Sequence, residues 1–313
     1  MKLRIYVFAI LALFCLGTLP AIAGQGADYL CPMHTQVHGY QGEKCPICGM
    51  ELVAAKPGQP EHDHFKAPPS VMKISNSVIL HVPAGVMLKK GKPVTIKVQL
   101  ASVDSNQPIS TYQLKEVHTQ RFHALIIDKS LSDYHHVHPV ETSKKGEYSL
   151  SFTPQKSGDY RMWADVTPTA TDKQEYVIGD LNVQGQSEAV SKKLNDSVTV
   201  DGLTFKLSFD GPLQAGQATM GMLRVMKDDK PFNQLEPIMG AYAHIVGFNE
   251  DFKTVAHIHP MGKEPTDAKQ RGGPDLEFHI EPSKPGFTKL FAQIRVNSKE
   301  IFAPFGLMVE KAK

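Results

Sequence analysis

Two sets of residues in this chain of 313 amino acids carry side chains that bind metal ions. One set, near the amino terminus, combines cysteines with histidine and methionine, and the other is a pattern of three histidines that occurs twice. Thiolate sulfur and imidazole nitrogen are the usual ligands of Zn²⁺, whereas thioether sulfur favours Cu(I). The chain has 14 histidines against four cysteines and one tryptophan, so histidine is the residue type that most distinguishes it.

The histidine pattern is H-x12-H-x-H, and both copies have the same spacing. The two trios are His123, His136 and His138 in the first copy, and His244, His257 and His259 in the second. Two strand residues separated by one position point to the same face, and a hairpin would set His123 opposite His136 and His244 opposite His257. We therefore expect each trio to form a three-nitrogen metal site with an open position. The alternative is that these histidines are structural.

One further position in each copy is a candidate fourth ligand. His118 lies five residues before His123, and Met239 stands at the aligned position before His244. Imidazole binds both oxidation states of copper, and thioether binds Cu(I). An exchange of histidine for methionine at one position is therefore compatible with a copper site.

The amino-terminal set has the layout C-x2-H followed by C-x2-C, which is close to zinc-ribbon spacing. Its members are Cys31, His34, Cys45 and Cys48. Three sulfur ligands and one nitrogen ligand would give a closed site for Zn²⁺. Met33 and Met50 add thioethers, which suit Cu(I). The alternatives are a redox pair formed by Cys45 and Cys48, or clustering by chance.

These residues resemble a known family. The pattern Tyr-x-Cys-Pro-Met-His, then Cys-Pro-x-Cys-Gly-Met-x-Leu, is similar to the heavy-metal-binding domain found at the ends of copper and silver efflux proteins. Those proteins include periplasmic adaptors of efflux pumps and metal-transporting P-type ATPases. The resemblance implies metal binding by Cys31, Cys45 and Cys48, with Met33, His34 and Met50 as helpers. It covers only residues 28–55, where Thr35 is a minor departure from the family's usual proline. The rest of the sequence shows neither transmembrane helices nor a long heptad hairpin, so neither the ATPase role nor the adaptor role carries over whole.

Residues 1–23 are predicted to be a secretory signal peptide. A basic start precedes an apolar run over residues 5–19, which is shorter than the roughly 20 residues of a membrane span. Ala21-Ile22-Ala23 then provides an A-x-A cleavage site. We expect an exported protein in a bacterial periplasm, without a membrane segment after cleavage; the alternative is an uncleaved anchor. Cleavage would leave three cysteines, an odd number that favours metal ligation over a disulfide framework.

The charge balance excludes two classes of partner. The chain has 34 Lys and Arg against 32 Asp and Glu, and both surplus charges, Lys2 and Arg4, lie in the predicted signal peptide. Binding to nucleic acid requires a basic face that neutralises phosphates, and docking on an anionic membrane requires a basic cluster. We therefore expect neither partner.

The rest of the chain is predicted to be β structure. A proline-rich linker over residues 56–70 is followed by short segments, such as 94–100 and 203–209, in which apolar and polar residues alternate. Turn residues recur at intervals of about ten residues, which is typical of sandwiches or barrels.

An internal repeat divides this β region. The segments around the two histidine trios match each other. Residues 154–164 also match residues 282–292, and the last aligned pair is Ala164 and Ala292. We predict two copies of one domain, at residues 71–185 and 186–313. The expected fold class is mainly β: a small cysteine-rich metal knuckle over residues 28–55, followed by two tandem immunoglobulin-like β-sandwich domains.

Three functions are compatible with these features. The favoured one is a periplasmic metal-binding protein that captures, buffers or delivers copper or zinc ions. The second is a zinc-stabilised interaction protein that docks a membrane metal transporter or efflux pump component, with the repeated histidines structural. The third is an enzyme whose three-histidine site activates water or oxygen. We do not expect an enzyme, because no nucleophile elbow, phosphate loop or acid/base pair accompanies the trios.

Overall fold

The computed structural model describes residues 29–30, 38–39, 44, 50–54, 76–83, 85–258, 261 and 264–312. The chain divides into two compact units, residues 1–67 and residues 68–313. Strands dominate the described residues of both units, and η1 (Thr111–Gln113) is a single 3-10 turn, so the expected mainly β class is confirmed. Within the described ranges no helix has the length and apolar character needed to cross a membrane. The predicted signal peptide and linker lie outside the described residues.

The first unit contains a small antiparallel sheet. Its strands are β1 (Tyr29–Leu30), β2 (His38–Gly39) and β3 (Val53–Ala54), in the order β2-β1-β3. Leu52 is buried beside β3, and Met50 is half-buried.

The first β domain consists of two sheets, with strand orders β4-β6-β10-β9 and β5-β12-β11-β7-β8. The strand bounds are β4 (Val78–His81), β5 (Met87–Leu88), β6 (Val94–Ser102), β7 (His123–Asp128), β8 (Tyr134–Val137), β9 (Val140–Glu141), β10 (Glu147–Phe152), β11 (Gly158–Val166) and β12 (Glu175–Val183). Alternation along β6 shows how the layers form, because Ile96, Val98 and Leu100 are buried between the sheets while Lys97 faces outward. The result is an immunoglobulin-like sandwich.

The second β domain repeats this architecture. Its sheets have the orders β13-β14-β15-β16, with β19 also paired to β15, and β18-β17-β20-β21. The strand bounds are β13 (Ser197–Val200), β14 (Leu203–Phe209), β15 (Thr219–Lys227), β16 (Lys230–Pro231), β17 (His244–Asn249), β18 (Val255–Ile258), β19 (Asp275–Ile280), β20 (Gly286–Val296) and β21 (Lys299–Val309). Strands β14, β15 and β19 correspond to β4, β6 and β10, and strands β17, β18, β20 and β21 correspond to β7, β8, β11 and β12.

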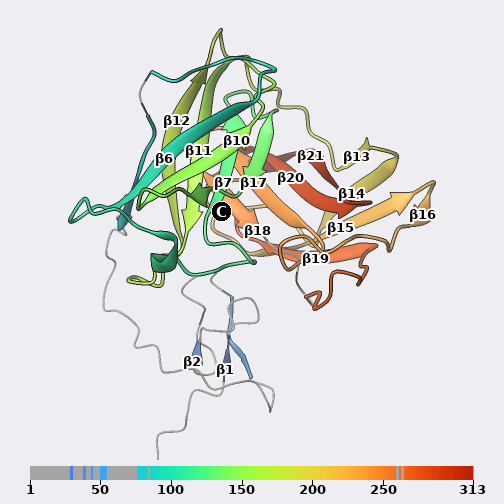
Figure 1. Ribbon diagram of the computed structural model, residues 1–313. Helices are drawn as coiled ribbons and strands as arrows, with labels where there is room; N and C mark the ends of the chain where they lie inside the picture. Colours follow the sequence, from blue (N-terminus) through green and yellow to red (C-terminus); the bar gives the residue numbers. More distant parts are fainter. Residues whose placement is uncertain are drawn as a thin grey trace, which may run out of the picture. The chain divides into compact units, whose positions relative to one another are not determined.

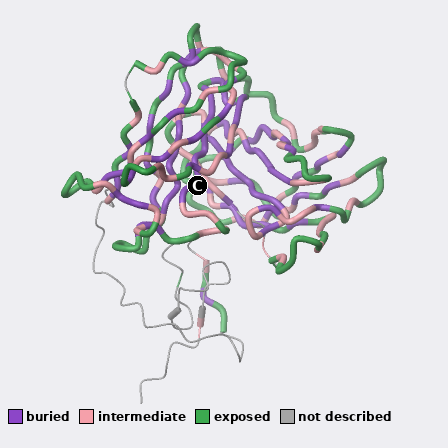
Figure 2. Tube along the Cα trace, viewed as in Figure 1, coloured by how far each residue is buried: buried purple, intermediate pink, exposed green. Residues whose placement is uncertain are grey.

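The two β domains pack against each other through the outer faces of the corresponding sheets (Figure 1). A third apolar core, distinct from the two sandwich interiors, joins Leu125 and Trp163 of the first domain to Phe248 and Phe291 of the second. Burial of both faces explains why every residue of β7 and β17 is buried, and Figure 2 shows the buried colour running through this central region. The guanidinium of Arg161 also donates a hydrogen bond across the interface to a backbone carbonyl, at 2.6 Å.

The interdomain core predicts that Leu125→Ala is strongly destabilising. Leu125 has no exposed surface, and truncating it leaves a cavity between the two domains. We expect the free energy of unfolding, measured by urea denaturation, to fall by about 2–5 kcal/mol. The matched control is Val140→Ala, because Val140 is 70% exposed, and it should change this value by less than about 0.5 kcal/mol. Equal stability of both variants would contradict the packing described here.

Candidate metal centre

The first histidine trio lies where β7 begins and β8 ends. The register pairs Leu125 with His136 and Ala124 with Val137, which places His123 level with His138 rather than with His136. The predicted pairing of His123 with His136 is therefore wrong. The loop that joins β7 to β8 shifts the register by two residues, and this shift keeps all three histidines on the same face.

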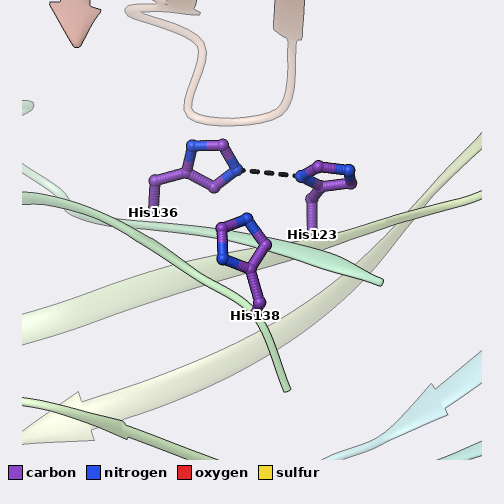
Figure 3. Close-up of side chains that lie close together, drawn as sticks. All are labelled: His123, His136 and His138. Carbon is purple, nitrogen blue, oxygen red and sulfur yellow. Dashed lines mark hydrogen bonds between the residues drawn. The ribbon is translucent and has the colours of Figure 1, made fainter. Parts of the chain in front are cut away.

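The three rings nevertheless converge, as Figure 3 shows. One ligand nitrogen from each of His123, His136 and His138 lies within 4.8 Å of the other two. The ring centroids are 4.9–5.3 Å apart. His123 and His136 are 3% and 7% exposed, so the nitrogen atoms face a site shielded from solvent.

The second trio joins the same cluster instead of forming a distant site. The register pairs Val246 with His257, so the predicted pairing of His244 with His257 is also wrong. The rings of His244 and His257 are 5.6 Å apart, and the ring of His257 lies 5.2 Å from that of His136. The trios meet because they lie on the outer sheet faces through which the domains pack. His259 lies outside the described residues.

His118 and Met239 occupy equivalent turns. His118 follows the bridge residue Val117 with φ 50°, and Met239 follows Ile238 with φ 48°, the left-handed conformation of a tight hairpin turn. His118 was predicted as a candidate fourth ligand of the first trio; it lies near His123, and its ring is also 5.8 Å from that of His244 in the other domain. We call the six described residues His118, His123, His136, His138, His244 and His257 the histidine cluster.

Hydrogen bonds fix the proton positions in the first trio. Nε2 of His123 lies 3.0 Å from the carbonyl oxygen of Val117, which only accepts, so Nε2 carries the proton. Nδ1 of His136 lies 2.8 Å from Oε1 of Gln293 and therefore donates to it. The amide of Gln293 is oriented by its own donation to Glu300, at 2.8 Å. In the neutral rings, Nδ1 of His123 and Nε2 of His136 are thus both unprotonated, and they face each other at 3.1 Å.

The second trio has a similar set of contacts. Nε2 of His244 donates to the carbonyl of Ile238 at 3.1 Å, and Nδ1 of His257 lies 2.8 Å from the Asp165 carboxyl group. Nδ1 of His244 and Nε2 of His257 face each other at 3.4 Å. Two facing lone pairs in a buried site, such as those of His123 and His136, repel unless a cation lies between them. The donor set of the first trio therefore fits a metal ion, and Nε2 of His138 is buried beside it without a hydrogen-bond partner among the described residues.

Burial keeps these imidazoles neutral. It lowers the pKa of His118 and of His138 to about 4, in both cases assisted by the proximity of His123. It lowers the pKa of His244 to about 3, and the pKa of His136 lies well below its usual value because of burial and its histidine neighbours. At neutral pH these four imidazoles are therefore neutral, and each has one unprotonated nitrogen.

The group that contacts the second histidine of each trio belongs to the other domain. Asp165 pairs with His123 in the sheet and Gln293 pairs with His244, so the two are equivalent positions of the repeat. Each contacts a histidine of the other domain. Burial raises the pKa of Asp165 to about 7. Neither residue was predicted as a site residue, although each directly follows the last alanine of the aligned segments.

The candidate ligands of the metal knuckle are only partly covered by the structure. Met50 is half-buried, and the next residue, Glu51, forms an antiparallel bridge with Lys44. The remaining predicted ligands, which lie outside the described residues, are Cys31, Met33, His34, Cys45 and Cys48.

Comparison with known families agrees with this organisation. A family model described as domain of unknown function DUF8832 matches residues 77–183 and again residues 198–311, well over half of the chain. The chain belongs to the DUF8832 family. A second model, described as heavy metal binding domain, matches residues 29–55. The resemblance of the metal knuckle is thus confirmed, and this member of the DUF8832 family carries a domain associated with metal binding.

The solved structures that match the chain share little sequence with it. The D00-D0 domain of intimin is 12% identical, with a TM-score of 0.22 over 74% of this chain and 98% of that one. Escherichia coli alpha-2-macroglobulin activated by porcine elastase is 12% identical, with a TM-score of 0.23 over 75% and 20% of the two chains. Salmonella alpha-2-macroglobulin reacted with methylamine is 10% identical, with a TM-score of 0.22 over 84% and 16%. Nothing about function follows from similarities of this size, and no curated protein matches the chain.

The neutral histidine cluster predicts that the metal-free protein loses stability in mild acid. Histidines in the unfolded chain have pKa values of about 6.5, whereas the folded values lie lower, so the unfolded state binds more protons below pH 6.5. Each such histidine should cost up to about 1.4 kcal/mol per pH unit as the pH falls from 6.5 towards 4. Asp165, whose folded pKa is raised, acts in the opposite direction but is a single group.

The measurement is the melting temperature of chelated protein between pH 7.5 and pH 5. His244→Gln removes one of these buried titrating groups and should flatten the decline, whereas His81→Gln, at an exposed position, should leave it unchanged. A melting temperature that stays constant or rises as the pH falls would contradict the neutral assignment.

Proposed function

We propose that this protein captures copper ions and buffers or delivers them, and that the interdomain histidine cluster is its main binding centre. The observation that carries the proposal is the pair of facing, unprotonated nitrogens of His123 and His136, 3.1 Å apart in a buried site. An ion placed between them would be held by His123 and His136 with His138, and His244, His257 and His118 would offer further ring nitrogens nearby. Bound copper would supply the positive charge that these lone pairs lack.

Copper is proposed over zinc because the chain combines imidazoles with thioethers near both candidate centres. Met239 stands in the turn beside His244, and Met33 and Met50 accompany the cysteines of the metal knuckle. Copper uses nitrogen ligands in either oxidation state and sulfur ligands as Cu(I), so such a chain can hold the ion across both states. Zinc remains the alternative ion.

The proposed role is binding rather than catalysis. His123, His136 and His244 are 3%, 7% and 0% exposed, so an ion in this cluster would be enclosed by protein on most sides. Enclosure suits storage of an ion, because a catalytic metal keeps a position open to its substrate. The predicted signal peptide supports placing this role in a bacterial periplasm, and the heavy-metal-binding domain supports a membrane metal transporter or efflux pump component as the partner that receives the ion.

The test is the number of copper and zinc ions bound per chain, measured by elemental analysis, in the wild type and in His136→Gln/His257→Gln. Glutamine keeps a donor for Gln293 and Asp165 but removes the ring nitrogen that would face the ion. We expect the wild type to bind more copper ions per chain than the variant. The variant should keep the copper held by the metal knuckle. His81→Gln, in an exposed position, should bind as the wild type does.

One result would overturn this proposal. If both proteins hold a single zinc ion and take up no copper, the cluster is structural. The zinc-stabilised interaction protein then becomes the better hypothesis.

The hydrogen bond between His257 and Asp165 of the other domain predicts a further effect, on the affinity for metal. Asp165→Asn keeps an acceptor for Nδ1 of His257 but removes the negative charge that makes its other nitrogen a stronger ligand. We expect metal affinity, measured by competition with a chromophoric chelator, to fall about 10- to 100-fold. Asp159→Asn, at the exposed start of the same strand, is the matched control and should leave the affinity unchanged.

A further inference from the structure

The outer face of the β15–β19 pair, on the other sheet of the second domain, differs in chemistry from its counterpart in the first. Met220 pairs with His279 and Met222 pairs with Glu277 across these strands. In the first domain the corresponding strands, β6 and β10, pair Thr95 with Ser151 and Lys97 with Ser149. The backbone pairing is the same, yet one copy carries thioether and imidazole groups where the other carries hydroxyl groups and an ammonium group.

Alternation shows which face these residues occupy. Leu223 and Val225 of β15, together with Phe278 and Ile280 of β19, are buried in the sandwich interior. Met220 and His279 alternate with them and therefore lie on the opposite, outer face. Cross-strand partners have Cβ atoms about 5 Å apart, which brings the thioether of Met220 within reach of the imidazole.

His279 is unusual for a residue on an outer face. It is only 7% exposed, and its Nε2 has no hydrogen-bond partner in the part of the chain that the structure describes. A buried polar atom without a partner costs about 1–3 kcal/mol and calls for an explanation. Burial also lowers the pKa of His279, so the ring is neutral and a ring nitrogen offers a lone pair. In the first domain the hydroxyls of Thr95 and Ser151 satisfy each other at 2.7 Å and are exposed.

A third methionine lies along the edge of the same sheet. The backbone N–H of Met261 donates to the carbonyl of Glu277 on β19. In the first domain the aligned residue, Val140, pairs with Ser149, the counterpart of Glu277. This correspondence places Met261 on the outer face, on the side of β19 away from Met220. Val140 is 70% exposed, whereas Met261 is half-buried.

We propose that Met220, Met261 and His279 form a second metal site, on the outer face of the second domain, which binds a soft monovalent ion. Two thioethers and one neutral imidazole are a donor set that selects Cu(I) or Ag(I) over Zn²⁺. The site shares no residue with the histidine cluster or the metal knuckle, so it extends the proposed function and does not depend on it.

The test is an Ag(I) titration of the full chain labelled with [¹³C-methyl]methionine, followed by NMR. We expect the methyl resonances of Met220 and Met261 to shift with Ag(I) and that of Met226 to stay in place. Met226 lies on the same strand and the same face, six residues and about 20 Å from Met220, and is therefore an internal control. Methyl resonances of Met220 and Met261 that do not move at saturating Ag(I) would overturn the proposal.

A matched variant gives the second readout. Met220→Thr/His279→Ser introduces the threonine and serine pair that Thr95 and Ser151 form at the equivalent position of the first domain. Because the first domain forms its sheet with this pair, the sheet of the variant should also form. We expect this variant to bind one Ag(I) ion fewer per chain than the wild type and than Met226→Leu. An unchanged count would refute the site.

If the double variant fails to fold, as judged by circular dichroism, Met261→Leu replaces it. This nearly isosteric change should weaken Ag(I) binding at the site at least tenfold, and an unchanged affinity would equally refute the proposal. The His136→Gln/His257→Gln protein separates this inference from the proposed function. The outer-face methyl shifts should persist there even if the histidine cluster binds no metal.

Discussion

The candidate metal centre depends on the apolar packing of two sheets through their outer faces. Leu125 and Trp163 of the first domain meet Phe248 and Phe291 of the second, and this contact removes water from the sheet ends where the histidines lie. The same contact brings Asp165 and Gln293 within hydrogen-bond distance of the other domain's histidines. Without this packing, each domain would expose its trio to water and would lack the group that sets the proton position of its second histidine.

Electrostatics and packing are linked in this arrangement. Excluding water from the imidazoles lowers their pKa values, and the hydrogen bond from His136 to Gln293 of the other domain leaves the unprotonated nitrogens of His123 and His136 facing each other. A cation bound there would interact with ligands from both domains at once. Because such an ion binds the packed state and not the separated domains, part of its binding free energy would stabilise the interface.

The two repeats have kept the histidines but diverged around them. A carboxylate at Asp165 corresponds to an amide at Gln293, and His118 corresponds to Met239. On the outer sheet faces, the hydroxyl pair of the first domain corresponds to Met220 and His279 in the second. Duplication has thus produced related positions that differ in charge and in ligand softness, which are the two properties that distinguish one metal ion from another.

The sequence by itself determined which residues bear the chemistry and which elements carry them. Alternation predicted the strands, and the repeated trio and the cysteine spacing identified the two β domains and the heavy-metal-binding domain, because these signals depend on local periodicity and spacing. Only the tertiary structure decided the hairpin register, which places His123 opposite His138. It also decided that His118 contacts His244 of the other domain, and that Asp165 and Gln293 each bond to a histidine of the other domain. These features arise from contacts between segments about 90 to 160 residues apart, or from a loop that sets register, and no local pattern encodes either.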